Sequence, residues 1–499
     1  MATATLLTPT LHIEIHLLKS SGSPIDAHQA TRKAAAEWIQ ENYATVTFGK
    51  LAGYQDTKHL EHVGSIDIAD FTGPLEPTGY YSLADTVLDC QTYVLHSESD
   101  SGIRRSIKRD SDPQSARSRV IALPNIALNE DWDSLVFEDG LPSRLLRYLV
   151  RMVGMMGKPG LNLATFNWNK LCLLHGPPGS GKSTLCRALA QKLSIRLGDQ
   201  FSKAVLVQVN ANALFSKFFG ESGKLIENTF HEVQGLAKDH ARLVIVVIDE
   251  VETIVSSRQR GTAGNECIDG LRATNQLLTA LDRVRSFPNI LVCCTSNLIE
   301  AIDPAFLDRV DIKQYIPCPS KAAVYNIFRG CLNELVRSEL LSVNDIEDVP
   351  HINGTLTSSP PPSAPRTQQS SPTRKRRHTV MTRTPPQTKE FAHIPASSMI
   401  QGDQCHEQDH EIPTLASALM AQRQNPLSPG QRIWELAQKC EGLCLSGRTL
   451  RRLPMLGLAM HTWGGRIRMT EAIGALEKAV GEELIAMSNR KAETEDPNA

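Results

Sequence analysis

The sequence lacks any long hydrophobic run and any excess of charge of one sign. Its longest wholly aliphatic stretch, Leu243 to Ile248, is far shorter than the roughly 20 apolar residues that a membrane-spanning helix needs. Lysine and arginine number 53 against 54 aspartate and glutamate residues, so no global basic surface is available for nucleic acid or anionic lipid. We therefore expect no direct membrane contact and no sequence-specific binding of nucleic acid.

Paired cysteines are also missing. The 11 cysteines are scattered, and the closest pairs, Cys293 with Cys294 and Cys440 with Cys444, have neither metal-finger nor disulfide-framework spacing. The N-terminus has no basic residue ahead of its apolar stretch, so a secretory signal is not expected. These absences predict a reducing compartment, either cytosol or nucleus.

A chain of 499 residues predicts about three structural units, because one hydrophobic core does not grow to this size. Apolar residues alternate over 11–18, and a helix-like stretch follows at 27–40, which predicts a small α+β N-terminal domain at 1–96. The next stretch is rich in serine and charge and has no apolar periodicity for much of its length. We therefore predict a linker at 97–129.

A larger α/β domain is predicted at 130–319. Four apolar runs of strand length, at 171–174, 205–209, 243–248 and 290–294, alternate there with segments of helix length. This pattern is typical of a parallel sheet covered by helices on both faces.

Helical periodicity returns at 320–350 and 414–490, which predicts a small helical lid domain. The intervening residues, 351–413, are rich in proline, serine, threonine and basic residues. Such a composition cannot bury enough apolar surface to fold. We therefore predict a disordered insert within the lid.

A glycine-rich loop carries the sharpest functional signal. It follows the apolar run at 171–174, precedes a helix-like stretch, and reads Gly176, Pro177, Pro178, Gly179, Ser180, Gly181, Lys182, Ser183 and Thr184. Glycines let backbone N–H groups turn inward around a phosphate, and the following helix N-terminus favours negative charge. We predict an ATP-binding loop in which Lys182 reaches the β- and γ-phosphates and Ser183 ligates Mg²⁺. The alternative is an ordinary glycine-rich turn.

Two carboxylates, Asp249 and Glu250, follow the apolar run at 243–248. Ligands bind at the carboxyl ends of strands in open α/β sheets. We predict that Asp249 belongs to the Mg²⁺ shell and that Glu250 is the general base that activates water. Taken alone, such a pair is more often a strand-to-loop boundary, but its place about 65 residues after the glycine-rich loop favours the functional interpretation.

Asn297 ends the strand-like run at 290–294 and is placed to orient water beside the γ-phosphate, although by itself it reads as a turn residue. The Thr295-Ser296-Asn297 sequence resembles sensor 1 of the AAA+ ATPases, a ring-forming P-loop NTPase class with a helical lid. In that class Arg309 occupies the place of the arginine finger, which acts on the neighbouring subunit's site. The alternative is a surface arginine paired with Asp308 or Asp311.

Gly447 and Arg448 lie in a Ser-Gly-Arg sequence that looks like sensor 2 of the same class. The resemblance implies that Arg448 reaches the nucleotide from the lid and that Gly447 lies beside it. The alternative is a glycine-broken helix start, with Ser446 or Gly447 near the cap.

Longer stretches resemble one family, the pachytene checkpoint AAA+ ATPases, which include a thyroid hormone receptor-interacting protein. The resemblance covers about 130–320 and 430–475 and is weaker in the N-terminal domain. It is carried by WDSLVFEDGL (132–141), LLHGPPGSGKSTLCRALAQKLSIRL (173–197), NANALFSKFFGESGKLIENTF (210–230), VIDEVETI (247–254), AIDPAFLDRVDIKQYI (301–316) and GLCLSGRTLRRLP (442–454).

The resemblance implies a homo-hexamer that uses ATP to unfold or remodel HORMA-domain proteins. These are the meiotic chromosome-axis protein and the spindle-checkpoint protein of the Mad family, with or without a HORMA adaptor bound at the N-terminal domain. It places the first pore loop, which grips substrate through aromatic contact, at Phe218, Phe219, Gly220 and Glu221. The alternative makes Phe218 and Phe219 core residues. The segment 256–270 resembles the second pore loop.

The family implies a nuclear location, at chromosomes and the nucleolus, with a cytoplasmic pool. A basic cluster, Arg374 to Arg377, fits a nuclear import signal and fits solvated linker charge equally well. Two other functions compete: a nucleic-acid motor or clamp loader, and a nucleotide-gated scaffold without turnover. The near-neutral charge disfavours the first, and the intact Glu250 disfavours the second.

Overall fold

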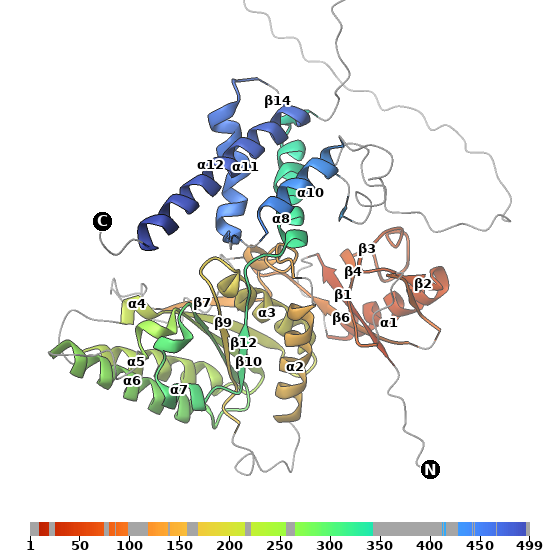
Figure 1. The fold of residues 1–499 in the computed structure, drawn as a ribbon. Coiled ribbons are helices and arrows are strands. Elements are labelled where there is room, and N and C mark those ends of the chain that lie inside the picture. The colour runs from red at the N-terminus through yellow and green to blue at the C-terminus, as the bar shows by residue number, and fades with distance from the viewer. Residues whose placement is uncertain are drawn as a thin grey trace, which may run out of the picture.

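Figure 1 shows the computed structural model of the chain, in which an N-terminal domain and a C-terminal helical lid each lie against a central α/β domain. The structure describes residues 9–18, 25–73, 79–84, 86–97, 118–137, 140–156, 168–214, 221–255, 265–342, 412, 414–415, 428–441, 443, 445–465 and 467–495. Among the helices in these ranges, none is both long and apolar enough to span a membrane.

The N-terminal domain is a four-stranded sheet with one helix. Its elements are β1 (Thr10–Leu17), α1 (Ile25–Asn42), β3 (Gly49–Leu51), β4 (Val63–Phe71) and β6 (Val87–Tyr93), beside a short pair, β2 (Thr45–Val46) and β5 (Tyr81–Ser82). The strand order is β3-β4-β1-β6, with β1 antiparallel to β4 and parallel to β6. Ile13 and Ile15 of β1 are fully buried in one cluster with Ile39 of α1. The predicted α+β domain is confirmed.

The central domain is built on a six-stranded sheet of order β12-β8-β11-β10-β9-β7. Its strands are β7 (Ser118–Leu123), β8 (Leu171–His175), β9 (Lys203–Asn210), β10 (Arg242–Asp249), β11 (Ile290–Ser296) and β12 (Ile312–Tyr315). Its helices are α2 (Leu141–Met156), α3 (Lys182–Arg196), α4 (Ala211–Leu214), α5 (Glu221–Ala237), α6 (Asn265–Val284) and α7 (Pro304–Asp308). Three short 3₁₀ turns are η4 (Ile126–Leu128), η5 (Val251–Thr253) and η7 (Ile299–Ala301).

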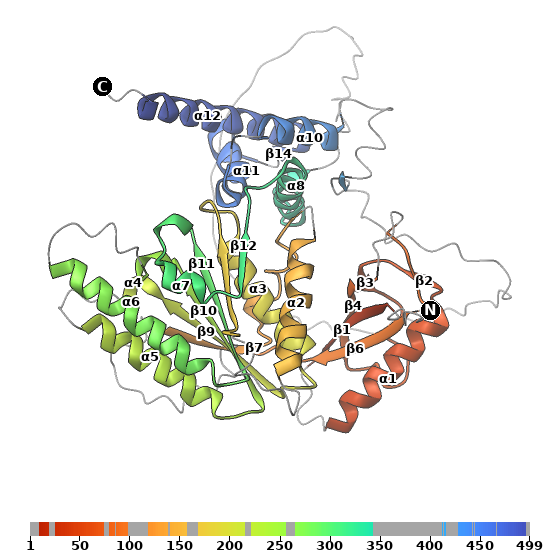
Figure 2. The same ribbon diagram turned by 60° about the horizontal axis from the view of Figure 1, so that its bottom comes forward.

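Helices cover both faces of this sheet, as Figure 2 shows. Alternate residues of β10 explain why its sequence is wholly apolar: Val244 and Val246 pack in a cluster with α5 and α6, whereas Leu243 and Ile245 pack in a second cluster with α2 and α3. Strands β8, β9, β10 and β11 run parallel to one another. All four strands predicted from apolar runs are therefore confirmed.

The edge strand β7 lies inside the predicted linker, and it corrects that prediction. Residues Ser118–Leu123 pair antiparallel with β9 and complete the sheet. The linker predicted at 97–129 is therefore wrong from Ser118 onward. An edge strand is covered on fewer sides than a central one, and most side chains of β7 are only half-buried. Its apolar signal is correspondingly short, and the preceding serine-rich and charged residues mask it.

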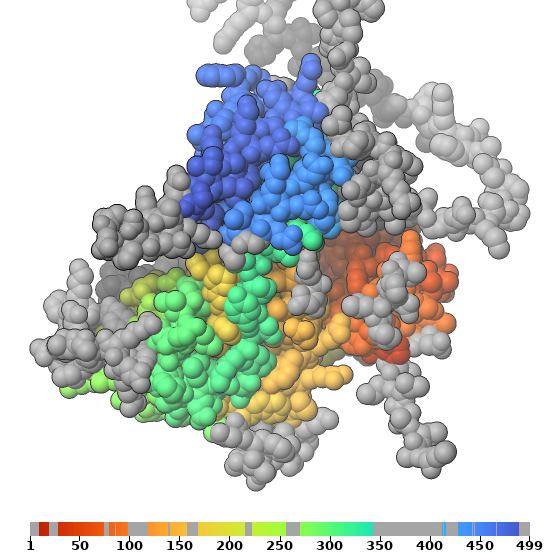
Figure 3. All heavy atoms as spheres, viewed as in Figure 1, coloured from red at the N-terminus to blue at the C-terminus, as the bar shows by residue number. Residues whose placement is uncertain are grey.

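The C-terminal lid is helical, as predicted. Its elements are α8 (Lys321–Arg337), β13 (Leu341–Ser342), α10 (Pro429–Lys439), α11 (Gly447–His461), β14 (Ile467–Arg468) and α12 (Met469–Glu495). One core cluster joins Phe328 of α8, Ile433 of α10, Leu450 of α11 and Ile473 of α12. Strand β13 pairs with β14, so segments on both sides of the predicted insert belong to one domain. Figure 3 shows the lid resting on the central domain as a separate lobe.

The predicted insert, 351–413, lies outside the described residues except at Ile412. That residue is 3% exposed and belongs to the lid core. Its N–H donates to Asn333 Oδ1 at 3.0 Å, and its carbonyl accepts from Arg329 Nε at 2.8 Å. Both partners lie on α8, so Ile412, which falls within the predicted insert, belongs to the lid.

The N-terminal domain packs on the central domain through buried charges. Glu14, on the face of β1 opposite Ile13 and Ile15, is 1% exposed. Its carboxylate lies 2.5 Å from Lys192 Nζ and 3.5 Å from Arg196 Nε, and both basic residues belong to α3. A second anchor comes from α2, where Arg147 donates from Nε and Nη2 to the Asp70 carboxylate at 3.0 and 2.8 Å. A buried ion pair of this kind fixes geometry, because removing either partner leaves a charge without compensation.

Candidate active site

The glycine-rich loop predicted to bind phosphate joins β8 to α3, as expected. Each of its glycines has a positive φ: 146° at Gly176, 72° at Gly179 and 94° at Gly181. A Cβ at Gly176 would lie 2.2 Å from Ile316 O, and one at Gly179 would lie 2.4 Å from Ser446 Cβ. Conformation and close packing therefore both require glycine in this loop.

Lys182 is the first residue of α3 and is 6% exposed. Its Nζ donates to Gly176 O at 2.9 Å and to Pro177 O at 2.7 Å, so the amine lies inside the loop. Burial lowers the pKa of Lys182, and the carboxylates of Glu252, Asp249 and Glu250 oppose that shift, Glu252 most strongly. The amine is thus held in place among three carboxylates and the loop carbonyls.

Ser180 supplies a second sign that the loop fits a phosphate. Its side chain is 8% exposed, and its Oγ has no hydrogen-bond partner within the described residues. A buried hydroxyl without a partner is costly unless something completes its hydrogen bonding. The neighbouring residues Pro178 and Thr184 complete the loop, and Thr184 Oγ1 accepts a weak hydrogen bond from Arg187 at 3.4 Å.

Asp249 ends β10 and receives two hydroxyl groups on one oxygen. Ser183 Oγ donates to Asp249 Oδ1 at 2.6 Å, and Thr295 Oγ1 donates to the same atom at 2.5 Å. Thr295 also accepts the backbone N–H of Glu250 at 3.2 Å. The predicted Mg²⁺ ligands Ser183 and Asp249 therefore face each other. Thr295 belongs to the stretch that resembles sensor 1, but the sequence did not indicate its role, which is to contact both Asp249 and the backbone of Glu250.

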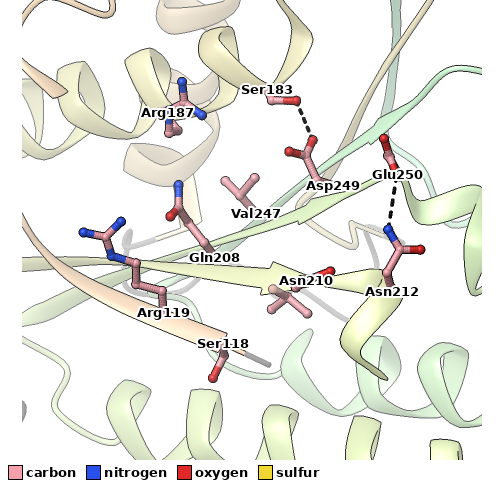
Figure 4. A pocket seen from close by; sticks show the side chains of 11 residues that line it. Ser118, Arg119, Ser183, Arg187, Gln208, Asn210, Asn212, Val247, Asp249 and Glu250 are labelled. Atoms are coloured by element: carbon pink, nitrogen blue, oxygen red, sulfur yellow. Dashed lines mark hydrogen bonds between the residues drawn. The ribbon is translucent and has the colours of Figure 1, made fainter. Parts of the chain in front are cut away.

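Glu250 occupies a strained position for a non-glycine residue, with φ 54° and ψ 50° in the left-handed region. Asn212 Nδ2, from α4, donates to Glu250 Oε2 at 3.4 Å, and a dashed line marks this interaction in Figure 4. The long distance makes this a weak hydrogen bond. Strained backbone is frequent at functional sites, and here it points the carboxylate away from the strand axis toward Asn212.

Asn297 follows β11, which lies between β8 and β10 in the sheet. Its backbone N–H donates to Glu252 Oε1 at 2.9 Å, while Glu252 Oε2 is buried with no partner in the described residues. The carboxyl ends of three adjacent strands therefore bring Lys182, Asp249 and Asn297 to one edge of the sheet. Glu252 was not predicted, because its role depends on a contact across 45 residues.

A cavity of about 470 Å³ opens beside these residues. Figure 4 shows Ser183, Asp249 and Glu250 on one side of it. The remaining wall is mostly polar and comes from α3, β7, β9, β10 and the start of α4: Arg187, Ser118, Arg119, Gln208, Asn210 and Asn212, with Val209 and Val247 as its apolar members. Arg119 lies in the predicted linker, and no motif in the sequence indicated that it would line this cavity.

The lid meets the loop directly. Gly447 begins α11, and its N–H donates to Gly179 O at 2.8 Å. Ser446 caps the helix by accepting from Thr449 N at 3.1 Å. The alternative interpretation of this segment, a helix start with Ser446 at the cap, is therefore also correct. Arg448 is exposed. One turn further on, Arg451 Nη2 donates to Ser134 O at 2.6 Å and ties the lid to the segment that precedes α2.

Arg309 is held by a partner that the sequence did not suggest. It pairs with Asp282 of α6 and not with Asp308 or Asp311, at 2.9 Å from Nε to Oδ1 and 3.0 Å from Nη2 to Oδ2. Asp311 instead accepts backbone N–H groups of Asn169 and Leu171. Hydrogen bonding to Asp282 raises the pKa of Arg309.

The predicted pore-loop residues Phe218, Phe219 and Gly220 lie outside the described residues, as does most of the predicted second pore loop, 256–270. Glu221 is the first residue of α5, and only its backbone is described. The aromatic grip therefore stays a prediction.

Thr295→Val is expected to lower stability and catalytic turnover together. The side chain is 2% exposed and valine has nearly its shape, but the change leaves the Glu250 N–H without its acceptor. A buried group without a partner costs about 1–3 kcal/mol. We expect that loss in denaturant unfolding, and at least a tenfold fall in kcat for ATP because Asp249 and Glu250 lose their common support.

Thr274→Val is the matched control for that variant. Thr274 is 1% exposed and its hydroxyl donates to Ile254 O and Gly270 O. A similar loss of stability with normal kcat is expected from the control. If Thr295→Val had the same kcat as Thr274→Val, the Thr295 hydroxyl would contribute to folding only.

Comparisons with known proteins agree with this geometry. Residues 172–318 match the ATPase family associated with various cellular activities (AAA), 397–484 match the TRIP13-like, AAA+ ATPase lid C-terminal domain, and 6–98 match the TRIP13 N-terminal domain. A pachytene checkpoint protein 2 homolog of Danio rerio is 34% identical over 360 residues, which cover 70% of this chain and 82% of that protein. A homolog of Oryza sativa subsp. indica is 46% identical over 221 residues, 44% of this chain and 47% of that protein.

The fold is similar to that of a solved structure, C. elegans PCH-2. The TM-score is 0.64 at 24% identity, over 95% of this chain and 99% of that one. The match spans all three parts of the molecule and supports the AAA+ fold with an N-terminal domain and a lid.

Proposed function

Because the chain belongs to the pachytene checkpoint protein 2 family and is an AAA ATPase that binds and hydrolyses ATP, we propose that it remodels HORMA-domain proteins as a homo-hexamer. The proposed substrates are a meiotic chromosome-axis protein and a spindle-checkpoint protein of the Mad family, with or without a HORMA adaptor. The activity would serve the meiotic recombination checkpoint and the spindle checkpoint.

One observation carries the hydrolytic part of the proposal. Asp249 Oδ1 accepts from both Ser183 and Thr295, and Glu250 is the next residue. Hydroxyl and carboxylate oxygens are the ligands that Mg²⁺ takes in nucleotide sites, where one or two protein groups join substrate phosphates. Ser183 and Asp249 would hold the ion, which supplies charge neutralisation for the phosphates.

Each of the predicted site residues has a separate role in ATP hydrolysis. Lys182 and the loop N–H groups bind the β- and γ-phosphates, and Asn297 orients a water molecule. Glu250 takes a proton from that water as its oxygen bonds to the γ-phosphorus, while the bond to the bridging oxygen breaks and ADP leaves. Arg309 of a neighbouring subunit stabilises the charge that develops on the γ-phosphate. Arg448 and Gly447 sense the nucleotide from the lid.

Family membership supports the protein substrate. The chain matches, in order, the TRIP13 N-terminal domain, the AAA domain and the TRIP13-like lid domain. Its net charge of -1 is unlike the basic surface by which nucleic-acid motors and clamp loaders neutralise phosphates. A protein substrate is therefore the better fit.

A stimulation assay and a trapping assay test the substrate. We expect a purified HORMA-domain protein to raise ATP turnover, whereas single-stranded DNA leaves it unchanged. In a pull-down, Glu250→Gln should retain the HORMA protein in the presence of ATP. Stimulation by DNA alone would favour a nucleic-acid motor, and turnover that neither addition changes would contradict the proposed substrate.

Replacing Phe218 and Phe219 together with alanine is expected to eliminate remodelling while basal ATP turnover persists. Aromatic and apolar contact grips a chain without reading its sequence, and truncating both rings removes it. The melting temperature decides the alternative: core phenylalanines would cost roughly 3–5 kcal/mol each. A large fall in melting temperature with loss of ATPase activity would place the rings in the core.

We also propose a location in the nucleus, at chromosomes and the nucleolus, with a cytoplasmic pool. The basic residues at 374–377 support it, although they lie outside the described residues. A fluorescent fusion in which these four residues are alanine should lose nuclear accumulation. Unchanged accumulation would show that this cluster is not the import signal.

A further inference from the structure

Arg309 has a fixed backbone position at the end of α7. Asp303 caps that helix by accepting from Ala305 N at 2.8 Å, and Pro304 begins it. The carbonyl of Arg309 accepts from Asn169 Nδ2 at 2.9 Å. The residue is therefore anchored to the strand end that leads into β8, whatever its side chain does.

The guanidinium group is also held on two sides. The Asp282 carboxylate accepts hydrogen bonds from Nε and Nη2 of Arg309, one on each oxygen. The carbonyl oxygen of Ala305 accepts from Nη1 at 2.9 Å. A guanidinium has five N–H groups in a rigid planar fork. Within the described residues these contacts use three of them, so one N–H on Nη1 and one on Nη2 are left for another acceptor.

The ion pair between Asp282 and Arg309 orients the Arg309 side chain more than it stabilises the fold. The side chains of Arg309 and Asp282 are 29% and 50% exposed, and ion pairs this exposed contribute little to stability. A two-point contact nevertheless removes most rotamers of a long side chain. Ordering Arg309 before a partner arrives lowers the entropic cost of using it across an interface.

We infer that Asp282 is a positioning residue for Arg309, which it holds ready to meet the γ-phosphate bound by a neighbouring subunit. The inference rests on the proposed function, in which Arg309 acts in trans. Asp282 itself touches no nucleotide. Its contribution is to hold the guanidinium group in one orientation, with two N–H groups left for that phosphate.

Steady-state kinetics of Asp282→Asn in the full-length protein test the inference. Asparagine keeps the size but loses the charge and one of the two acceptors. We expect kcat for ATP to fall about tenfold, since misplacing a catalytic group by about 1 Å costs up to 10²-fold. KM for ATP should stay within about twofold, because the nucleotide pocket of the same subunit is untouched. Asp282→Glu, which restores the carboxylate, should recover part of kcat.

Glu227→Gln is the matched control. It removes an ion pair with Arg283, the residue next to Asp282 on α6, at 3.2 Å and with side chains 49% and 54% exposed. Its kcat should equal that of the unaltered protein. If it fell as far as that of Asp282→Asn, the effect would belong to the helix and the inference would be overturned.

Subunit mixing separates a role in trans from damage to the subunit's own site. Mixtures of Asp282→Asn with Glu250→Gln create interfaces that join a sound Arg309 to a sound Glu250. We expect their activity to exceed the sum of the two separate proteins. Activity no greater than that sum would overturn the inference.

Arg309→Ala distinguishes failure of this inference from failure of the proposed function. Loss of the finger should lower kcat by about 10³-fold. If Arg309→Ala lowers kcat in this way while Asp282→Asn retains full kcat, the positioning role of Asp282 is wrong and the assignment of Arg309 as the finger is kept. If Arg309→Ala itself retains full kcat, the assignment of the finger fails, and the inference fails with it.

Discussion

Lys182→Ala is expected to reduce the affinity for ATP by about 10²-fold or more. The Lys182 amine is buried at the base of the loop and already donates to two loop carbonyls, at 2.9 and 2.7 Å. In the proposed complex it donates to the β- and γ-phosphates, and each hydrogen bond to a charged group contributes roughly 1.5–3 kcal/mol. Two such bonds correspond to about 10²- to 10⁴-fold in the dissociation constant.

Isothermal titration with ATP and with a non-hydrolysable analogue measures this loss. Lys203→Ala is the control, because Lys203 is an exposed lysine at the start of β9, the opposite end of the sheet from the loop. Its affinity should be unchanged. Tight ATP binding by Lys182→Ala would mean that the loop N–H groups alone hold the phosphates.

Glu250→Gln is expected to leave ATP binding intact and to lower kcat by about 10²- to 10⁴-fold, the usual contribution of a general base. Glutamine has the size of glutamate and keeps an oxygen that can accept from Asn212. It cannot take a proton from water. The strained backbone at position 250 is retained, since both residues tolerate the left-handed region equally.

Single-turnover hydrolysis and ATP binding, measured on the same preparation, separate the two effects. Glu334→Gln, on the exposed face of α8, should change neither. An equal loss of ATP affinity in Glu250→Gln and Lys182→Ala would contradict the division of roles between a phosphate ligand and a base.

Much of the fold was predictable because it depends on local patterns. Strand β10 reads as six consecutive aliphatic residues, since helices cover both of its faces. The loop at 176–184 was equally clear, because each glycine meets a demand that only glycine satisfies. Strand β7 was missed, because an edge strand with half-buried side chains has too weak a pattern to stand out beside a charged linker.

The site residues that lie at the carboxyl ends of strands were predictable from the sequence. Thr295 and Glu252 lie within the motifs that were read, but what they do depends on contacts across 46 and 45 residues. The alternative to an arginine finger paired Arg309 with an aspartate one or two positions away. Its C-terminal place on α7 turns the side chain toward Asp282 of α6 instead, 27 residues earlier, and only the packed fold shows this.

The buried contact between Glu14 and α3 has a mechanical consequence. Lys192 and Arg196 follow Lys182 by ten and fourteen residues in one uninterrupted helix, so about 15–21 Å of rigid rod joins the phosphate loop to the N-terminal domain. A displacement of the N-terminal domain is therefore transmitted to the loop directly through α3. We therefore expect these two parts to move as one rigid body relative to the lid, which meets the loop at Gly447 and Gly179.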